Sequence, residues 1–180
     1  MNKEWYQDLI TKYKASQKTI SRVNEIFCQA DIRYADLEYE VIVAGFLDND
    51  AISINEKLVT LEPTKMNGIK GPQKGLKSVA IKLLEASGFN VVDLEKAFSG
   101  GIADIIARNK SGESIAVECG PCTIRKAIEY LEKPKNTLWI LTYGGILYEV
   151  KRGSSWNAFH RFYKSLMDED QKKAVKIAFP

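Results

Sequence analysis

The sequence predicts an α/β protein whose main unit, residues 71–153, has the element order αβββαβ and a mixed sheet flanked by helices. Two observations predict this class. Residues 74–87 repeat apolar side chains at helical spacing and stop at Gly88, a residue that commonly follows a helix. Short apolar segments separated by turn residues come next, as is typical of strands buried in a sheet.

The N-terminal segment has a different character. Residues 4–28 and 34–47 space their apolar side chains for helices, and residues 52–61 alternate around a polar centre, which predicts a β-hairpin. Residues 63–71, with their proline and glycines, are typical of a linker. We therefore expect residues 1–70 to form a separate helical unit with a hairpin, either winged-helix-like or used for dimerisation.

In the main unit, a strand is expected over residues 89–98, followed by two more that carry one acid each, Asp104 and Glu118. A tight turn centred on Ser111 would place these acids opposite each other. The same register pairs Ile106 with Ala116 and Arg108 with Ser114.

Opposed residues of an antiparallel pair have Cβ atoms roughly 5 Å apart and point to the same face. Two carboxylates at that distance repel each other and lose hydration in apolar surroundings. The stability of a fold does not require such a pair, whereas Mg²⁺ binds to oxygen ligands of this kind. The pattern thus predicts a metal site at Asp104 and Glu118.

The remaining elements follow in order. Residues 123–132 are expected to form a helix with Thr123 as its N-cap. Residues 137–143 and 146–151 are expected to be strands, and residues 154–180 closing helices.

Composition narrows the class of protein. The chain of 180 residues is 45% hydrophobic and 27% charged, as is typical of globular proteins. It has no apolar run near the roughly 20 residues of a membrane span and no apolar signal core, so we expect a cytoplasmic protein without a membrane partner. The net charge is only +3, but residues 71–153 carry twelve basic and nine acidic residues, a balance that suits a phosphate substrate.

Over residues 70–152 the chain resembles the PD-(D/E)XK nuclease superfamily, which includes restriction endonucleases and archaeal Holliday junction resolvases. The resemblance lies in the element order and in Lys70-Gly71, Gly88-Phe89, Ser99-Gly100-Gly101, Asp104 and Ile115-Ala116-Val117-Glu118. It implies a restriction-endonuclease-like fold and a homodimeric Mg²⁺- or Mn²⁺-dependent endo- or exodeoxyribonuclease acting on duplex, branched or single-stranded DNA. It also implies that Asp104, Glu118 and the backbone carbonyl of Cys119 bind the metal.

The chain departs from the family pattern at two positions. Gly120 stands where the family has a lysine that orients the attacking water, and Lys77 stands where the first helix often carries a metal-binding Glu. Some family members supply the basic group from the following helix, which makes Lys126 the expected catalytic substitute, with Arg125 next to it. Substrate contacts are expected from Ser99, Lys77, Arg108 and Arg125.

Two alternatives remain open. Without the lysine, the chain could be an inactive nuclease fold that binds nucleic acid without cutting it. The segment Cys119-Gly120-Pro121-Cys122 also matches the thioredoxin redox motif and would make the protein a thiol-disulfide oxidoreductase. The elements around this segment do not follow the thioredoxin order, and we favour a structural role for both cysteines.

Overall fold

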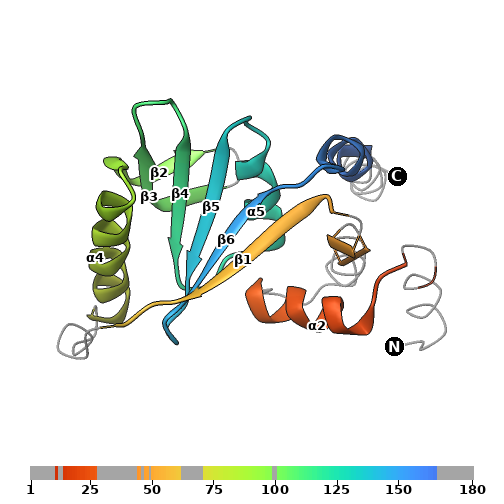
Figure 1. Ribbon diagram of the computed structural model, residues 1–180, viewed down its shortest axis with the longest axis horizontal. Coiled ribbons are helices and arrows are strands. Elements are labelled where there is room, and N and C mark those ends of the chain that lie inside the picture. The colour runs from red at the N-terminus through yellow and green to blue at the C-terminus, as the bar shows by residue number, and fades with distance from the viewer. Residues whose placement is uncertain are drawn as a thin grey trace, which may run out of the picture.

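A computed structural model describes residues 11, 14–27, 44–45, 47–48, 50–61, 71–98 and 101–165. The chain is α/β, with a six-stranded mixed sheet in the order β1-β6-β5-β4-β3-β2 (Figure 1). The strands are β1 (Ile52–Leu58), β2 (Asn90–Phe98), β3 (Gly101–Arg108), β4 (Ser114–Cys119), β5 (Asn136–Leu141) and β6 (Ile146–Arg152). Only β4 and β5 pair in parallel. Within the described part of the chain, no helix has the length and apolar character needed to cross a membrane.

The element order expected for the main unit is confirmed. Helix α4 (Gly71–Ala86) precedes β2, β3 and β4, and helix α5 (Ile124–Leu131) connects β4 to the parallel strand β5. The Thr123 side chain accepts a hydrogen bond from the Lys126 backbone N–H, which confirms the predicted N-cap. A parallel pair needs a crossover of this kind, and a helix usually provides it.

The sheet separates two apolar cores, because successive side chains of a strand point to opposite faces. Helix α4 packs on one face against Ile105, Val117 and other residues of the core that we call the α4-side core. Helices α5 and α2 (Gln17–Ile26) pack on the other face against Ala116 and its neighbours, which form the α5-side core (Figure 1).

The hairpin expected over residues 52–61 is wrong. Residues 52–58 form one continuous strand, β1, which pairs antiparallel with β6 at an edge of the sheet. The polar residues 55–57, interpreted as a turn, lie on this edge strand and are exposed. Polar and charged side chains suit such a strand because only one of its sides is paired.

The helix expected over residues 4–28 is interrupted, and residues 4–10, 12–13 and 28 of that range lie outside the described residues. Helix α2 begins after Ser16, whose side chain accepts from the Thr19 backbone N–H, and residues 14–16 are not helical. Its apolar face joins the α5-side core, as does the helix over residues 156–165. The helix predicted over 34–47 falls largely outside the described residues. The linker at 63–71 does so except for residue 71, and residues 166–180 do so entirely.

Candidate functional site

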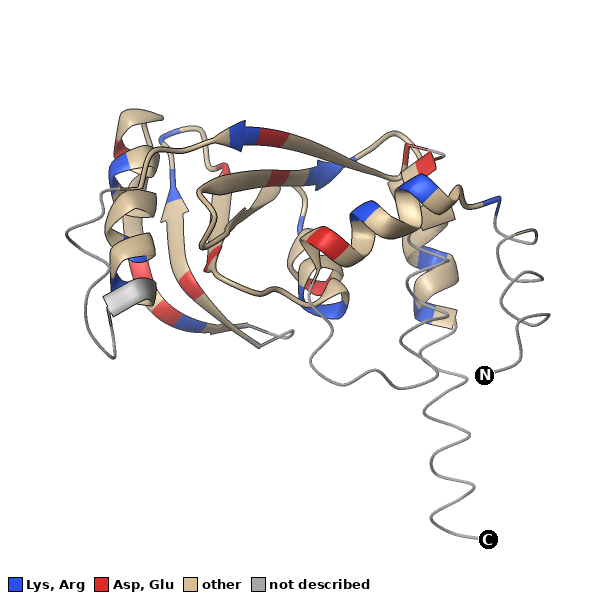
Figure 2. Cartoon of the chain, turned by 90° about the horizontal axis from the view of Figure 1, so that it is seen from below, with Lys and Arg blue, Asp and Glu red and all other residues tan. Residues whose placement is uncertain are grey.

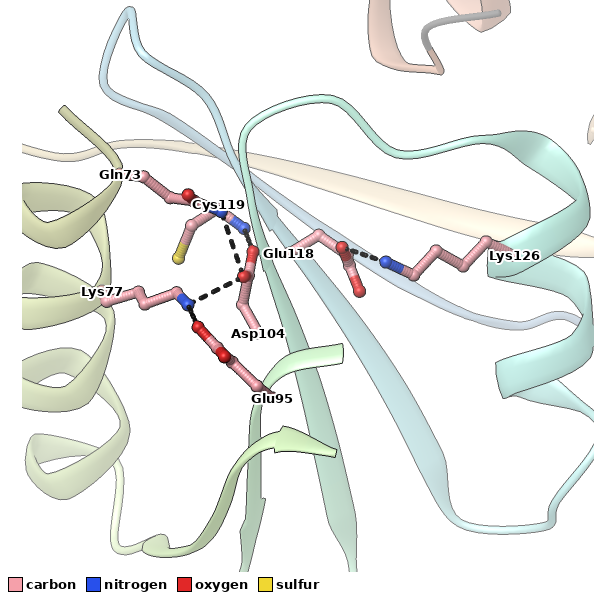
Figure 3. A network of polar contacts seen from close by, with 7 residues as sticks. All are labelled: Gln73, Lys77, Glu95, Asp104, Glu118, Cys119 and Lys126. Carbon is pink, nitrogen blue, oxygen red and sulfur yellow. Dashed lines mark hydrogen bonds and ion pairs between the residues drawn. The ribbon is translucent and has the colours of Figure 1, made fainter. Parts of the chain in front are cut away.

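The two acids lie on neighbouring strands, Asp104 within β3 and Glu118 next to the last residue of β4. Strands β3 and β4 pair Ile106 with Ala116 and Arg108 with Ser114, and their last pair is Ile105 with Val117. Asp104 and Glu118 each lie one residue beyond that last pair (Figure 3).

The strand alternation breaks at Asp104, so the two carboxylates turn toward different helices, and the prediction that they point to the same face of the sheet is wrong. Ala103 packs in the α5-side core although Ile105 packs in the α4-side core, whereas a regular strand would place both on one face. The break coincides with Glu95 of the partner strand β2, which has a positive φ of 52°. As a result, Asp104 contacts α4 and Glu118 contacts α5 (Figure 3).

Asp104 is held by three donors. The Cys119 backbone N–H donates to Oδ2 at 2.8 Å, and the Gln73 amide donates to Oδ1 at 3.2 Å. The Lys77 ammonium lies 3.0 Å from Oδ1 and also pairs with Glu95 at 2.9 Å. Burial lowers the pKa of Lys77, but the two carboxylates outweigh burial and the net pKa is raised. Lys77 therefore stays charged and fixes Asp104 against α4.

Among the described residues, Glu118 is the one buried charged residue, with a relative exposure of 4%. The Lys126 ammonium lies 2.5 Å from Oε2, whereas Oε1 is buried and has no hydrogen-bond partner within the described part of the chain. Burial raises the pKa of Glu118 to about 7, although the neighbouring lysine opposes the rise. The unpartnered oxygen leaves Glu118 with an open position for a proton or a cation.

The other candidate residues are distributed unevenly. Lys126 lies beside Glu118, whereas Arg125 is exposed and pairs with Glu129 one turn further along α5. Arg108 lies at the far end of β3, four residues from Asp104 or roughly 13 Å along an extended strand. Ser99 lies outside the described residues.

The two cysteines of the redox-like segment are buried and face different cores. Cys119 packs in the α4-side core and Cys122 in the α5-side core, and neither is in a disulfide. Burial raises the pKa of Cys119 to about 12 and also raises the pKa of Cys122. Reactive thiols have a lowered pKa and some exposure, so this arrangement gives no support to thiol redox chemistry.

Sequence reasoning missed Gln73 as a donor to Asp104. Gln73 and Lys77 are four residues apart in α4, so both lie on the face of the helix that meets Asp104. Helical spacing from Lys77 would have indicated this partner. The sequence has no comparable pattern that would indicate the contact of Lys77 with Glu95, because Glu95 lies on another element and has an unusual backbone conformation.

The oxygen ligands suit a hard divalent cation in kind, although the two carboxylates turn toward different helices. The Oε1 atom of Glu118 supplies an oxygen without a hydrogen-bond partner among the described residues. Within the described residues, no group of three or more His, Cys, Asp or Glu side chains is placed to hold a metal ion. A cation here would therefore take its remaining ligands from backbone carbonyls, water or substrate.

Basic and acidic residues are interspersed over the strands and helices (Figure 2). The distribution of charge therefore does not mark one surface for a substrate, and the individual cations near the two acids are more informative.

A scan against protein-family models, a search of curated proteins and a search of solved structures each found no match for this chain.

Proposed function

We propose that this protein is a metal-dependent nuclease with a restriction-endonuclease-like core that hydrolyses DNA phosphodiester bonds. The observation that carries the proposal is the presence of Asp104 and Glu118 on adjacent strands, each one residue beyond the last β3–β4 pair, with Lys126 in contact with Glu118. The order of elements from α4 to β6 agrees with this fold.

Asp104, Glu118 and the carbonyl of Cys119 would hold Mg²⁺ or Mn²⁺. A bound metal of this kind supplies an activated water and stabilises the leaving oxygen of an in-line displacement. Gln73 and Lys77 orient Asp104, and the Cys119 N–H fixes its second oxygen. Lys126 favours the ionised form of Glu118, the form that binds a cation.

Lys126 would take the role of the lysine that the family has in place of Gly120. Its ammonium reaches the Glu118 carboxylate from α5, whereas Gly120 follows β4 with φ +114° and has no side chain. An added Cβ at Gly120 would lie about 3.0 Å from the Tyr143 hydroxyl, so the backbone there favours glycine. A lysine on helix α5 can reach Glu118 without a side chain at position 120.

A second function, nucleic-acid binding without cleavage, is favoured by the two ion pairs. Lys77 and Lys126 already neutralise both acids, so a cation must displace or share these contacts. The same protein could then bind a phosphate backbone and leave it intact.

Cleavage assays on supercoiled, linear and single-stranded DNA in Mg²⁺ and in Mn²⁺ test the proposal. We expect metal-dependent cutting by the wild type that falls at least ~100-fold in Glu118→Gln and Asp104→Asn, since metal-bound groups contribute several kcal/mol. Glu149→Gln is the matched control, because Glu149 is an ion-paired carboxylate on β6 of the same sheet. Equal cutting by all four proteins would refute the proposal, and DNA binding without cutting would favour the second function.

A further inference from the structure

A cavity of about 670 Å³ lies on the sheet and includes Arg108, at the end of β3. Strands β2 and β3 line one side of it through Asp93 and Arg108. The end of α5 and the loop that follows line the other side through Tyr130 and Lys133. Its size falls within the range of pockets that enclose small organic ligands.

The two acids that line this cavity are both ion-paired, which leaves a positive charge from its other cations. Asp93 pairs with Lys96 at 2.8 Å, and Glu129 pairs with Arg125 at 3.0 Å. Two lining cations, Arg108 and Lys133, are exposed and have no ion-pair partner within the described residues. They come from opposite walls, so a single anionic group could contact both.

The wall between these cations offers hydrogen bonds. The hydroxyl groups of Tyr130 and Ser114 lie 3.2 Å apart, and either of them can donate to the other. The Asn136 amide nitrogen donates to the Tyr130 backbone carbonyl at 2.9 Å, which fixes the amide and leaves its oxygen as an acceptor.

Apolar side chains complete the lining. Ile106 from β3, Ala97 from β2 and Pro134 from the loop supply this surface. An inorganic phosphate would fill only a small part of such a cavity. A ligand that uses all of the lining needs an anionic group, an apolar face and a hydrogen-bonding edge.

We propose that this cavity binds a nucleoside monophosphate, with the phosphate between Arg108 and Lys133 and the base against Ile106 and Pro134. Arg108 and Lys133 bind the phosphate through charge-assisted hydrogen bonds. The ligand is either a free nucleotide or the 5′-phosphorylated end of a strand. The proposal does not rest on nuclease activity, because no residue of the cavity belongs to the pair of acids or contacts it.

Calorimetric titration of the full chain with deoxyadenosine monophosphate in EDTA tests the proposal without any metal. We expect saturable binding that weakens as salt rises, and much weaker binding of deoxyadenosine and of inorganic phosphate. Arg108→Gln and Lys133→Gln should each weaken binding at least ~10-fold. Lys18→Gln, a change to an exposed lysine on α2, should leave binding unchanged.

A second variant separates the cavity from general basic attraction. Ala97 is exposed and lines the cavity, so Ala97→Trp should fill it while keeping every charge and the fold, as circular dichroism would verify. Loss of binding in this variant supports the proposal. Absence of binding by the wild type, equal binding of the nucleoside, or full binding by Ala97→Trp would overturn it.

Titration with a short oligonucleotide, either 5′-phosphorylated or 5′-hydroxylated, identifies the source of the phosphate. Tighter binding of the phosphorylated form assigns the cavity to strand ends. Binding of the mononucleotide alone assigns it to free nucleotides. Equal binding of both oligonucleotides would show that the phosphate is not what the cavity recognises and would overturn the proposal.

Discussion

Replacing Lys126 with methionine should make the stability of the protein fall with pH above 7. Methionine keeps the aliphatic stem of the side chain and removes only the charge that faces Glu118. Removing one partner of a buried ion pair commonly costs ~3–5 kcal/mol, but a carboxyl group can limit that cost by taking up a proton.

The magnitude follows from the pKa of Glu118, which burial raises from 4.5 to about 7. Because the folded chain holds this proton more tightly than the unfolded chain, the stabilising effect of protonation is complete below pH 4.5. It is lost as pH rises through 7, and the loss amounts to roughly 3 kcal/mol. Without Lys126 the pKa rises further, so the loss continues above pH 7 by up to ~1.4 kcal/mol per pH unit relative to the wild type.

Urea unfolding at pH 5, 7, 8 and 9 in EDTA measures this difference. The control is Lys151→Met, since Lys151 pairs with Glu149 on a more exposed part of the sheet, where an ion pair contributes ~0–1 kcal/mol. The free energy of unfolding of this control should depend on pH in the same way as that of the wild type. A Lys126→Met curve that is also parallel between pH 7 and 9 would refute the account of Glu118.

The remaining predictions concern the cysteines and one turn. Iodoacetamide at pH 8 should modify Cys119 and Cys122 only after unfolding, because both thiols are buried and have raised pKa values. Peptide mass spectrometry measures the modification. Rapid labelling of the native protein, or a Cys119–Cys122 disulfide, would contradict this prediction. Gly153→Ala should lower the free energy of unfolding by ~1–3 kcal/mol, since its Cβ would overlap the Asp50 carbonyl oxygen. Gly144→Ala, where the added Cβ meets only one atom at 3.8 Å, should change it by less than ~0.5 kcal/mol, and equal effects would refute the packing argument.

Local patterns in the sequence were enough to predict the main unit. Apolar spacing located α4 and α5, and the turn centred on Ser111 set the register of β3 and β4. The position of Lys126 beside Glu118 also followed, because a helix that begins directly after β4 must start near the end of that strand.

Non-local conformation explains what the sequence did not predict. The turn of Asp104 toward α4 coincides with the positive φ of Glu95, which no pattern in β2 indicates. The pairing of β1 with β6 joins segments about a hundred residues apart, and the polar residues of β1 resemble a turn when read alone. The cavity around Arg108 and Lys133 is assembled from strands and a loop that are distant in the sequence.

Binding of Mn²⁺ to the purified protein, measured by calorimetry, tests the central claim most directly. It asks whether two lysine-paired carboxylates accept a cation, and it is not confused by traces of a contaminating nuclease. The account predicts one saturable site that is lost in Glu118→Gln and in Asp104→Asn and is retained in Glu149→Gln. No binding by the wild type, or equal binding by all four proteins, would contradict it.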